Sequence, residues 1–269
     1  MAQRKRNKLL STIAIFATLF FFYLPILLMI VFSFNSSKSL SVWSGFSLRW
    51  YVNLFNDREI VEVVTNTMIV AVLATLISTI IGTLTAIGLS KSKRVVREIV
   101  LNINNLPILN PEIVTAIGLM LLIVSLGIDK GLFTMLLAHI GFCIPYVILS
   151  VLPKLRRLDE NITEAALDLG ATPWQALMKV IVPQLMPAII SGALIAFTMS
   201  FDDFVISYFV SGSAKNISIF VYTMRRRINP SVNALSSIIV LVITVVLIII
   251  NVIPLFTKKK ERNLVHEEV

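Results

Sequence analysis

The sequence predicts an all-α integral membrane protein: a bundle of six transmembrane helices with both termini in the cytoplasm. Three observations support this prediction. Of the 269 residues, 57% are hydrophobic and only 14% are charged, whereas about a quarter of the residues in a soluble domain are charged. Six apolar segments are long enough to cross a bilayer, which takes about 20 helical residues. The Lys and Arg residues are distributed unequally between the loops on the two sides.

The six predicted spans are almost free of charge. Glu112, Asp202 and Asp203 are the only charged residues within them. Helices are expected because backbone polar groups inside a bilayer must bond within their own segment. We expect residues 1–269 to form a single transmembrane domain. Its predicted spans are residues 9–34, 64–90, 99–128, 131–153, 183–211 and 233–257.

The loop charges set the predicted orientation. With the N-terminus in the cytoplasm, 16 of the 24 Lys and Arg residues lie inside and 8 outside, as the positive-inside rule requires. The net charge of +9 therefore reflects the orientation of the chain in the lipid bilayer, and we expect no nucleic-acid partner. The triplet Arg225–Arg227 is an exception on the outer side. It is either a solvated loop cluster or a docking patch for an acidic partner.

The sequence offers no set of residues for a metal site or for catalysis. Its single cysteine, Cys143, lies in an apolar segment, and His139 and His266 are far apart. A metal site needs a cluster of such residues at ligand spacing. We therefore expect no metal and no catalytic residues, and we interpret His139 as a packed or hydrogen-bonded group.

The loop of residues 154–182 is the longest polar stretch predicted on the cytoplasmic side. It has the signals of two short helices joined by a turn. Asp159 suits the N-cap of the first helix, and Gly170 suits its C-terminal end. Thr172 and Gln175 form a capping box around a proline, which indicates the start of the second helix.

This loop also contains a spacing found in a known family. ABC-importer permeases have a cytoplasmic EAA loop of the form EAA-x3-G-x9-I-x-L-P, which this loop resembles, with Val at the Ile and Leu positions. The resemblance implies the type I ABC importer permease architecture. The matching residues are Glu164-Ala165-Ala166, then Gly170 after three residues, Val180 after nine more, and Val182-Pro183 after one more.

The resemblance implies partners as well as a fold. In such importers the loop of residues 154–182 contacts ABC ATPase subunits, with Glu164, Ala165, Ala166 and Gly170 coupling ATP hydrolysis to transport. A homologous second permease subunit and an external substrate-binding protein complete the assembly. The chain contains no G-x-x-x-x-G-K-[ST] motif for phosphate binding. We therefore expect no cofactor and no enzymatic activity in this chain, and ATP to be used by a partner ATPase.

Charged groups within spans are candidates for a transport pathway, because their burial in a bilayer is unfavourable. Counted from Glu98 and from Pro187 as the cytoplasmic edges, Glu112 and Asp202 lie at similar depths, about 21 and 22 Å at 1.5 Å per residue. Phe204 and Tyr208 offer cation–π contacts. Asp202 and Asp203 are about 100° apart on a helix, so one of them is free to cap a broken helix. Pro107 and Pro111, which precede Glu112 within about a turn, predict a kink there.

Longer segments narrow the resemblance to the polyamine branch of these permeases, in particular to the second permease subunit of spermidine/putrescine importers. That implies a location in the bacterial cytoplasmic membrane. Three alternatives stay open: a permease of the same type for another solute, an ion-coupled secondary transporter, and a non-transporting scaffold. The arginine triplet Arg225–Arg227 would repel a polycation in solution, which does not fit a simple electrostatic funnel on the outer side. The segments that carry the resemblance are residues 111–114, 166–171, 197–207, 219–224 and 230–235.

Overall fold

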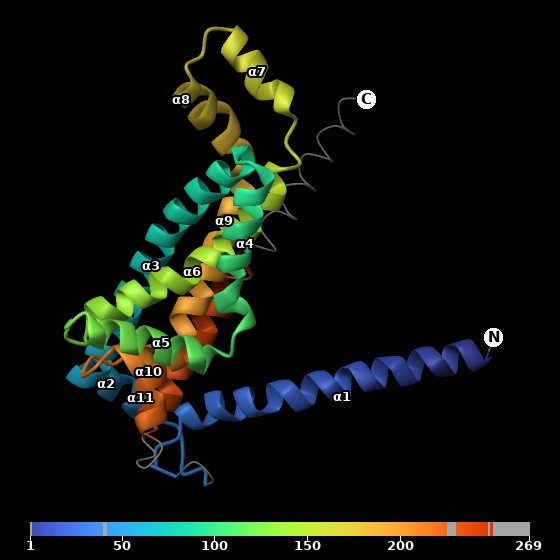
Figure 1. The fold of residues 1–269 in the computed structure, drawn as a ribbon. Coiled ribbons are helices and arrows are strands. Elements are labelled where there is room, and N and C mark those ends of the chain that lie inside the picture. The colour runs from blue at the N-terminus through green and yellow to red at the C-terminus, as the bar shows by residue number, and fades with distance from the viewer. Residues whose placement is uncertain (1, 40–41, 225–229, 247, 250–269) are drawn as a thin grey trace. The chain divides into compact units, whose positions relative to one another are not determined.

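A computed structural model describes residues 2–39, 42–224, 230–246 and 248–249. In these residues the regular structure is helical, apart from one isolated antiparallel bridge between Asn35 and Phe46. The predicted all-α class is therefore confirmed (Figure 1). Four described helices are long and apolar enough to cross a membrane, or five if one bent pair counts as a span. The six-span count and the cytoplasmic termini stay predictions.

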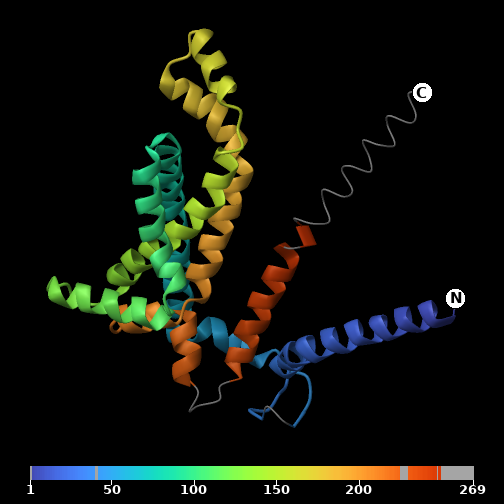
Figure 2. The same cartoon turned by 45° about the vertical axis from the view of Figure 1, so that its right-hand side comes forward.

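The chain divides into two compact units, one formed by residues 1–61 and 224–269 and the other by residues 62–223. Figure 2 shows the same helices turned by 45°. The triplet Arg225–Arg227 and residues 247 and 250–257 of the sixth predicted span lie outside the described residues. The helices are α1 (Ala2–Ser33), α2 (Arg49–Asn56), α3 (Arg58–Lys91), α4 (Arg94–Leu109), α5 (Glu112–Ser125), α6 (Leu132–Leu155), α7 (Glu160–Asp168), α8 (Pro173–Ala176), the π-helix η1 (Leu177–Ile181), α9 (Val182–Asp202), α10 (Val205–Val210), α11 (Ile217–Thr223) and an apolar helix over Ser231–Val246.

In the first unit, Asn35 organises the connection that follows α1. Its side-chain amide donates to the carbonyl oxygens of Ser39 and Val42, and its Oδ1 accepts from the Ser44 backbone N–H. The indole Nε1 of Trp50 donates to the Asn35 carbonyl at 2.7 Å. These bonds satisfy backbone groups that form no regular ladder, and they fix α2 against the end of α1.

In the second unit, α6 is the central helix and packs against α9. Val147 of α6 lies between two glycines: Gly82 of α3 and Gly192 of α9 both pack against it without a side chain of their own. Gly82 belongs to the small-residue stripe Ser78, Gly82 and Ala86, which permits close helix approach. The structure thus shows that this stripe includes a packing contact within the subunit.

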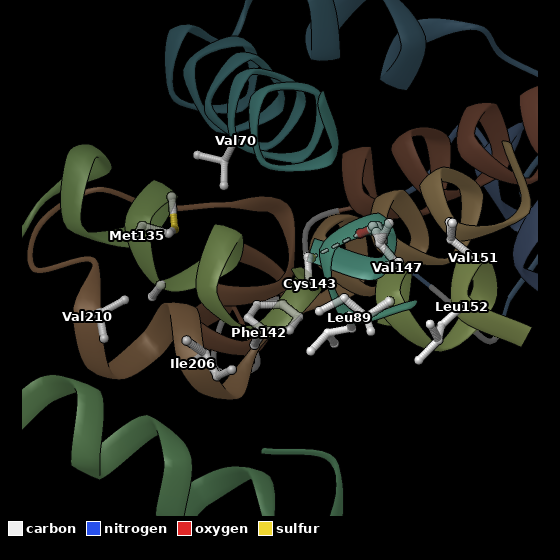
Figure 3. Close-up of a cluster of buried hydrophobic side chains, with 14 of the residues drawn as sticks. Val70, Leu89, Met135, Phe142, Cys143, Val147, Val151, Leu152, Ile206 and Val210 are labelled. Atoms are coloured by element: carbon white, nitrogen blue, oxygen red, sulfur yellow. Dashed lines mark hydrogen bonds between the residues drawn. The ribbon is translucent and has the colours of Figure 1, made fainter. Parts of the chain in front are cut away.

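The hydrophobic core follows α6 along its length (Figure 3). Fully buried Met135, Val147 and Val151 come from this helix, and Ile206 and Val210 join them from α10. Cys143 lies in the same cluster, buried, with its Sγ donating to the Ala196 carbonyl at 3.4 Å. Through this core, α10 and the end of α9 pack against α6, the central helix of the second unit.

Two apolar segments are broken rather than continuous. The predicted third span forms α4 and α5, which are bent by 107° at the break around Asn110 and Pro111. The predicted kink is therefore confirmed. In the predicted fifth span, α9 ends at Asp202 and α10 begins at Val205. The acidic residues of the spans all lie at these two breaks.

Candidate functional site

The predicted cytoplasmic loop forms two capped helices. Asp159 caps α7, with its Oδ1 accepting from the Asn161 backbone N–H at 3.0 Å. Gly170 ends the helix with a φ of +85°, in the left-handed region that glycine adopts without steric penalty. The Ala171 N–H then bonds back to the Ala166 carbonyl at 3.1 Å. The capping signals in the sequence are confirmed at both ends.

The second helix of the loop starts as its capping box predicts. The Thr172 N–H donates to Gln175 Oε1 at 2.9 Å, and the Gln175 N–H donates to Thr172 Oγ1 at 3.3 Å. Pro173 occupies the first helical turn. The chain then continues through the π-helix η1 into α9 without a loop.

The loop projects beyond the ends of α4 and α9 (Figure 1), and it carries exposed apolar side chains. Leu169 is 90% exposed and Trp174 is 64% exposed. Glu164 and Ala165 are also exposed, and Ala166 is half-buried. A groove of about 260 Å³ separates the loop from the end of α3; it is lined by Ile87, Lys91, Thr163, Leu167, Pro173, Trp174, Ala176, Leu177 and Ile181.

The two aspartates at the end of α9 have different environments. Asp202 is the last residue of the helix and is exposed. Asp203 is 5% exposed, and its carboxylate accepts from the Ile206 N–H at 3.3 Å and from the Ser207 N–H at 2.7 Å. Asp203 therefore caps α10 across the break, one of the roles expected for a member of this pair.

Glu112 lies at the other break, at the first residue of α5, and is exposed. Its carboxyl is close enough to those of Asp203 and Asp202 to interact with their charges. A cavity of about 170 Å³ opens beside it; it is lined by Pro107, Ile108, Asn110, Glu112, Thr115, Phe142, Tyr146, Met199 and Ile206.

An aromatic cluster adjoins the Asp202 end of α9. Phe204 lies with its ring centroid 5.4 Å from that of Tyr208 and 4.5 Å from that of Tyr222. Tyr208 and Tyr222 are 6.2 Å apart and about half exposed. Phe204 and Tyr208 were predicted as pathway residues, but Tyr222 was not. The spacing of residues in the sequence does not reveal Tyr222, because Tyr222 lies on α11 and comes close to Phe204 only when the chain folds.

A buried polar network supports the same break. His139 of α6 lies with Nδ1 2.7 Å from Ser200 Oγ and Nε2 2.9 Å from Ser207 Oγ. Its Nε2 is also 3.3 Å from Asp203 Oδ2. The amide of Asn216 donates to the Asp203 carbonyl at 2.8 Å and to Ser207 Oγ at 2.9 Å. The interpretation of His139 as a hydrogen-bonded group is confirmed, although its partners were not predictable.

The loop before α11 is held from α3 as well. The Ile217 N–H donates to Thr67 Oγ1 at 2.8 Å, and the Asn66 amide donates to the Lys215 carbonyl at 3.2 Å. Among the described residues, no group of three or more His, Cys, Asp and Glu is arranged to hold a metal ion. The site is therefore built from carboxylates, hydroxyls and aromatic rings at two helix breaks.

Comparison with known proteins decides the family. A family model described as "Binding-protein-dependent transport system inner membrane component" matches residues 78–258. This chain belongs to that family. The matched region includes the loop of residues 154–182, both helix breaks and the His139 network.

Curated relatives cover most of the permease. The putrescine transport system permease protein PotI of Escherichia coli K12 is 40% identical over 229 residues, covering 81% of each chain. The spermidine/putrescine transport system permease protein PotC of the same strain is 37% identical over 231 residues, covering 85% of this chain and 87% of that protein. PotC of Haemophilus influenzae is 35% identical over 241 residues, covering 89% and 93%.

Solved structures show the same fold. A chain in the crystal structure of a bacterial ABC transporter involved in import of the acidic polysaccharide alginate matches with a TM-score of 0.72, covering 94% of this chain and 97% of that chain at 18% identity. An alginate ABC transporter in complex with an alginate pentasaccharide-bound periplasmic protein gives 0.67, with 91% and 93% coverage at 17% identity. The chain is a permease subunit of an ABC importer.

Proposed function

We propose that this permease imports polyamines, spermidine and putrescine, as part of an ATP-driven, binding-protein-dependent importer in a bacterial cytoplasmic membrane. The observation that carries the polyamine assignment is the pair of exposed carboxylates, Glu112 and Asp202, beside an aromatic cluster at two helix breaks. The relatives named for putrescine and spermidine transport support the same substrate class.

The chemistry of the breaks favours an organic cation. Asp202 ends α9, so its carboxylate adds to the negative end of the helix dipole. The predicted spans contain no Lys or Arg. The rings of Phe204, Tyr208 and Tyr222 offer π faces for an ammonium group and apolar surface for a methylene chain. A polyamine has both of these features, with positive charges separated by short alkyl segments.

The coupling loop supplies the connection to ATP. In the proposed assembly the exposed apolar side chains of Leu169 and Trp174 contact an ATPase subunit, and Glu164, Ala165, Ala166 and Gly170 fix the coupling helix in its groove. Closure of the ATPases moves α7 and α8 as rigid units. The continuous path from α8 through η1 into α9 carries that motion to Asp202. Rigid-body motion of short capped helices is a common form of such transmission.

The proposed importer contains further chains. A homologous second permease faces this subunit across the pathway, two ATPases bind on the cytoplasmic side, and an external binding protein delivers the substrate. We further propose that the permease has six spans with both termini in the cytoplasm, as the distribution of Lys and Arg indicates. Residues 1–269 then form one transmembrane domain.

Uptake of radiolabelled spermidine by cells that express the complete importer tests this function. The matched comparison is the same importer with Glu164→Ala, which removes an exposed carboxylate without touching the pathway. We expect uptake with the natural sequence, competition by unlabelled putrescine, and loss of uptake in the variant. Absence of spermidine uptake by an assembled complex would overturn the polyamine assignment, and a screen of other organic cations would follow.

A further inference from the structure

The hydrogen-bond pattern around Ser207 fixes the direction of each bond in the buried network. The Ser207 hydroxyl has one proton, which it donates to Asp203 Oδ2 at 2.7 Å. Its oxygen must therefore accept from its other neighbours, the Asn216 amide and His139 Nε2. The Nε2 atom of His139 is thus the protonated nitrogen, and it points its N–H at both Ser207 and Asp203.

The Asp203 carboxylate is held by donors around its own helix break, most of them at Oδ2. It accepts from the N–H groups of Ile206 and Ser207 and from the Ser207 hydroxyl, and His139 Nε2 lies close to its Oδ2. It is buried, and an unpaired carboxylate in such a place would be strongly unfavourable. These donors explain why an acidic residue is stable here without a substrate.

The backbone of Asp202 is held from the opposite side. The Ser218 hydroxyl donates to the Asp202 carbonyl at 3.0 Å. Asn216, two residues before Ser218, donates its side-chain amide to the Asp203 carbonyl. Its own Oδ1 accepts from the Ile219 N–H at 2.8 Å. The last turn of α9 is therefore held between α6 and the residues Asn216 and Ser218 at the start of α11, and the Asp202 side chain is exposed.

We propose that the two neighbouring aspartates have separate roles, and that His139, Asn216 and Ser218 are positioning residues for the transport pathway. Asp203 is the fixed cap of the helix break. Asp202 is the group that meets the ammonium of the substrate, and the network of Asp203, His139 and Asn216 sets its direction. This inference rests on the proposed polyamine function, which supplies the cation that Asp202 contacts.

The test is the Michaelis constant for spermidine uptake into proteoliposomes that contain the complete importer. Asp202→Asn is expected to raise KM by about tenfold, as for the loss of one hydrogen bond to a charged group. His139→Leu breaks the network and is expected to raise KM in the same direction. His139→Gln retains an N–H donor and is expected to stay within about twofold of the natural protein, as a conservative rescue.

The double variant separates positioning from simple loss of structure. If His139 acts through Asp202, then His139→Leu adds little to the KM of Asp202→Asn, because residues in one network are not additive. Cys143→Ala, one turn further along α6 and outside the network, is the control and is expected to leave KM unchanged. If His139→Leu does not assemble, Ser218→Ala provides the same comparison from a partly exposed position.

Two results would overturn the inference alone. One is a change in maximal rate or amount of complex in the His139 and Ser218 variants with no change in KM. The other is KM effects that multiply fully with Asp202→Asn. Both require saturable spermidine uptake by the natural protein. Absence of that uptake would instead overturn the proposed function, and with it this inference.

Discussion

Gly82 of α3 lies directly against Val147 of α6. A Cβ atom at position 82 would be 2.7 Å from the Cβ of Val147 and 3.3 Å from the Ile144 carbonyl oxygen. The first distance is far below van der Waals contact, and the neighbouring atoms belong to a branched side chain and a backbone with little freedom to move. The contact between these helices therefore depends on glycine at this position.

Substitution of Gly82 by alanine is expected to destabilise the permease by about 1–3 kcal/mol, the usual range for overpacking a filled interface. Gly88→Ala is the matched control, because it lies on the same helix with no atom within 4 Å of the added Cβ. Thermal unfolding of the detergent-solubilised complex, followed by size-exclusion chromatography, measures both. Equal melting temperatures for the two variants would contradict the packing account.

Gly170 is expected to matter for coupling through its backbone conformation. Alanine at a φ of +85° is strained by about 1 kcal/mol, so Gly170→Ala should distort the turn between α7 and α8. Gly170→Asn is expected to be milder, because asparagine tolerates the left-handed region. The effect of each substitution on coupling is measured as the spermidine-stimulated ATPase activity of the reconstituted complex.

The control for this prediction is Gly127→Ala, which introduces the same kind of strain at a φ of +67° outside the coupling loop. It should cost similar stability and leave the ratio of transport to ATP hydrolysis unchanged. A lower ratio in both variants would show that general destabilisation, rather than the geometry of the loop, is responsible.

Thr172 is expected to stabilise α8 through its capping box. Thr172→Ala removes the acceptor for the Gln175 N–H and should destabilise the helix by about 1 kcal/mol. Thr172→Ser retains the hydroxyl and should behave like the natural protein. The rate of amide hydrogen exchange at residues 174–176 measures the difference, and equal protection in the two variants would rule out the cap as the source of order.

Trp174 is expected to contribute to ATPase binding, because it is a large, exposed side chain on the coupling loop. Trp174→Ala should reduce the amount of ATPase that copurifies with the permease by several-fold, as for an aromatic residue at an interface centre. Asn161→Ala, an exposed polar residue on α7, is the control and should have no effect. Full ATPase recovery with Trp174→Ala would place the docking surface elsewhere.

Local signals in the sequence predicted the coupling loop accurately. Asp159, Gly170 and Thr172 each act within a few residues of themselves, so the residue type and its spacing were sufficient. The helical class followed from composition and hydropathy in the same way. The kink near Glu112 was predictable because proline acts on its own turn.

The pathway was only partly predictable because its contacts join distant segments. Asp202 and Asp203 look equivalent in the sequence, and only the partners of Asp203 on α6 and α10 distinguish them. Tyr222 joins Phe204 through a turn between helices rather than through helical spacing. The end of α9 at Asp202 has no proline or glycine to announce it, and it depends on the cap that Asp203 gives to α10.

The most direct test of the proposed importer is radiolabelled spermidine uptake into proteoliposomes that contain the permease, its second permease, its ATPases and the external binding protein. The vesicles enclose either ATP or a non-hydrolysable analogue, with no ion gradient. We predict accumulation with ATP alone, and none with the analogue or with Glu164→Ala. Accumulation that follows an imposed ion gradient and ignores ATP would contradict the account and indicate a secondary transporter.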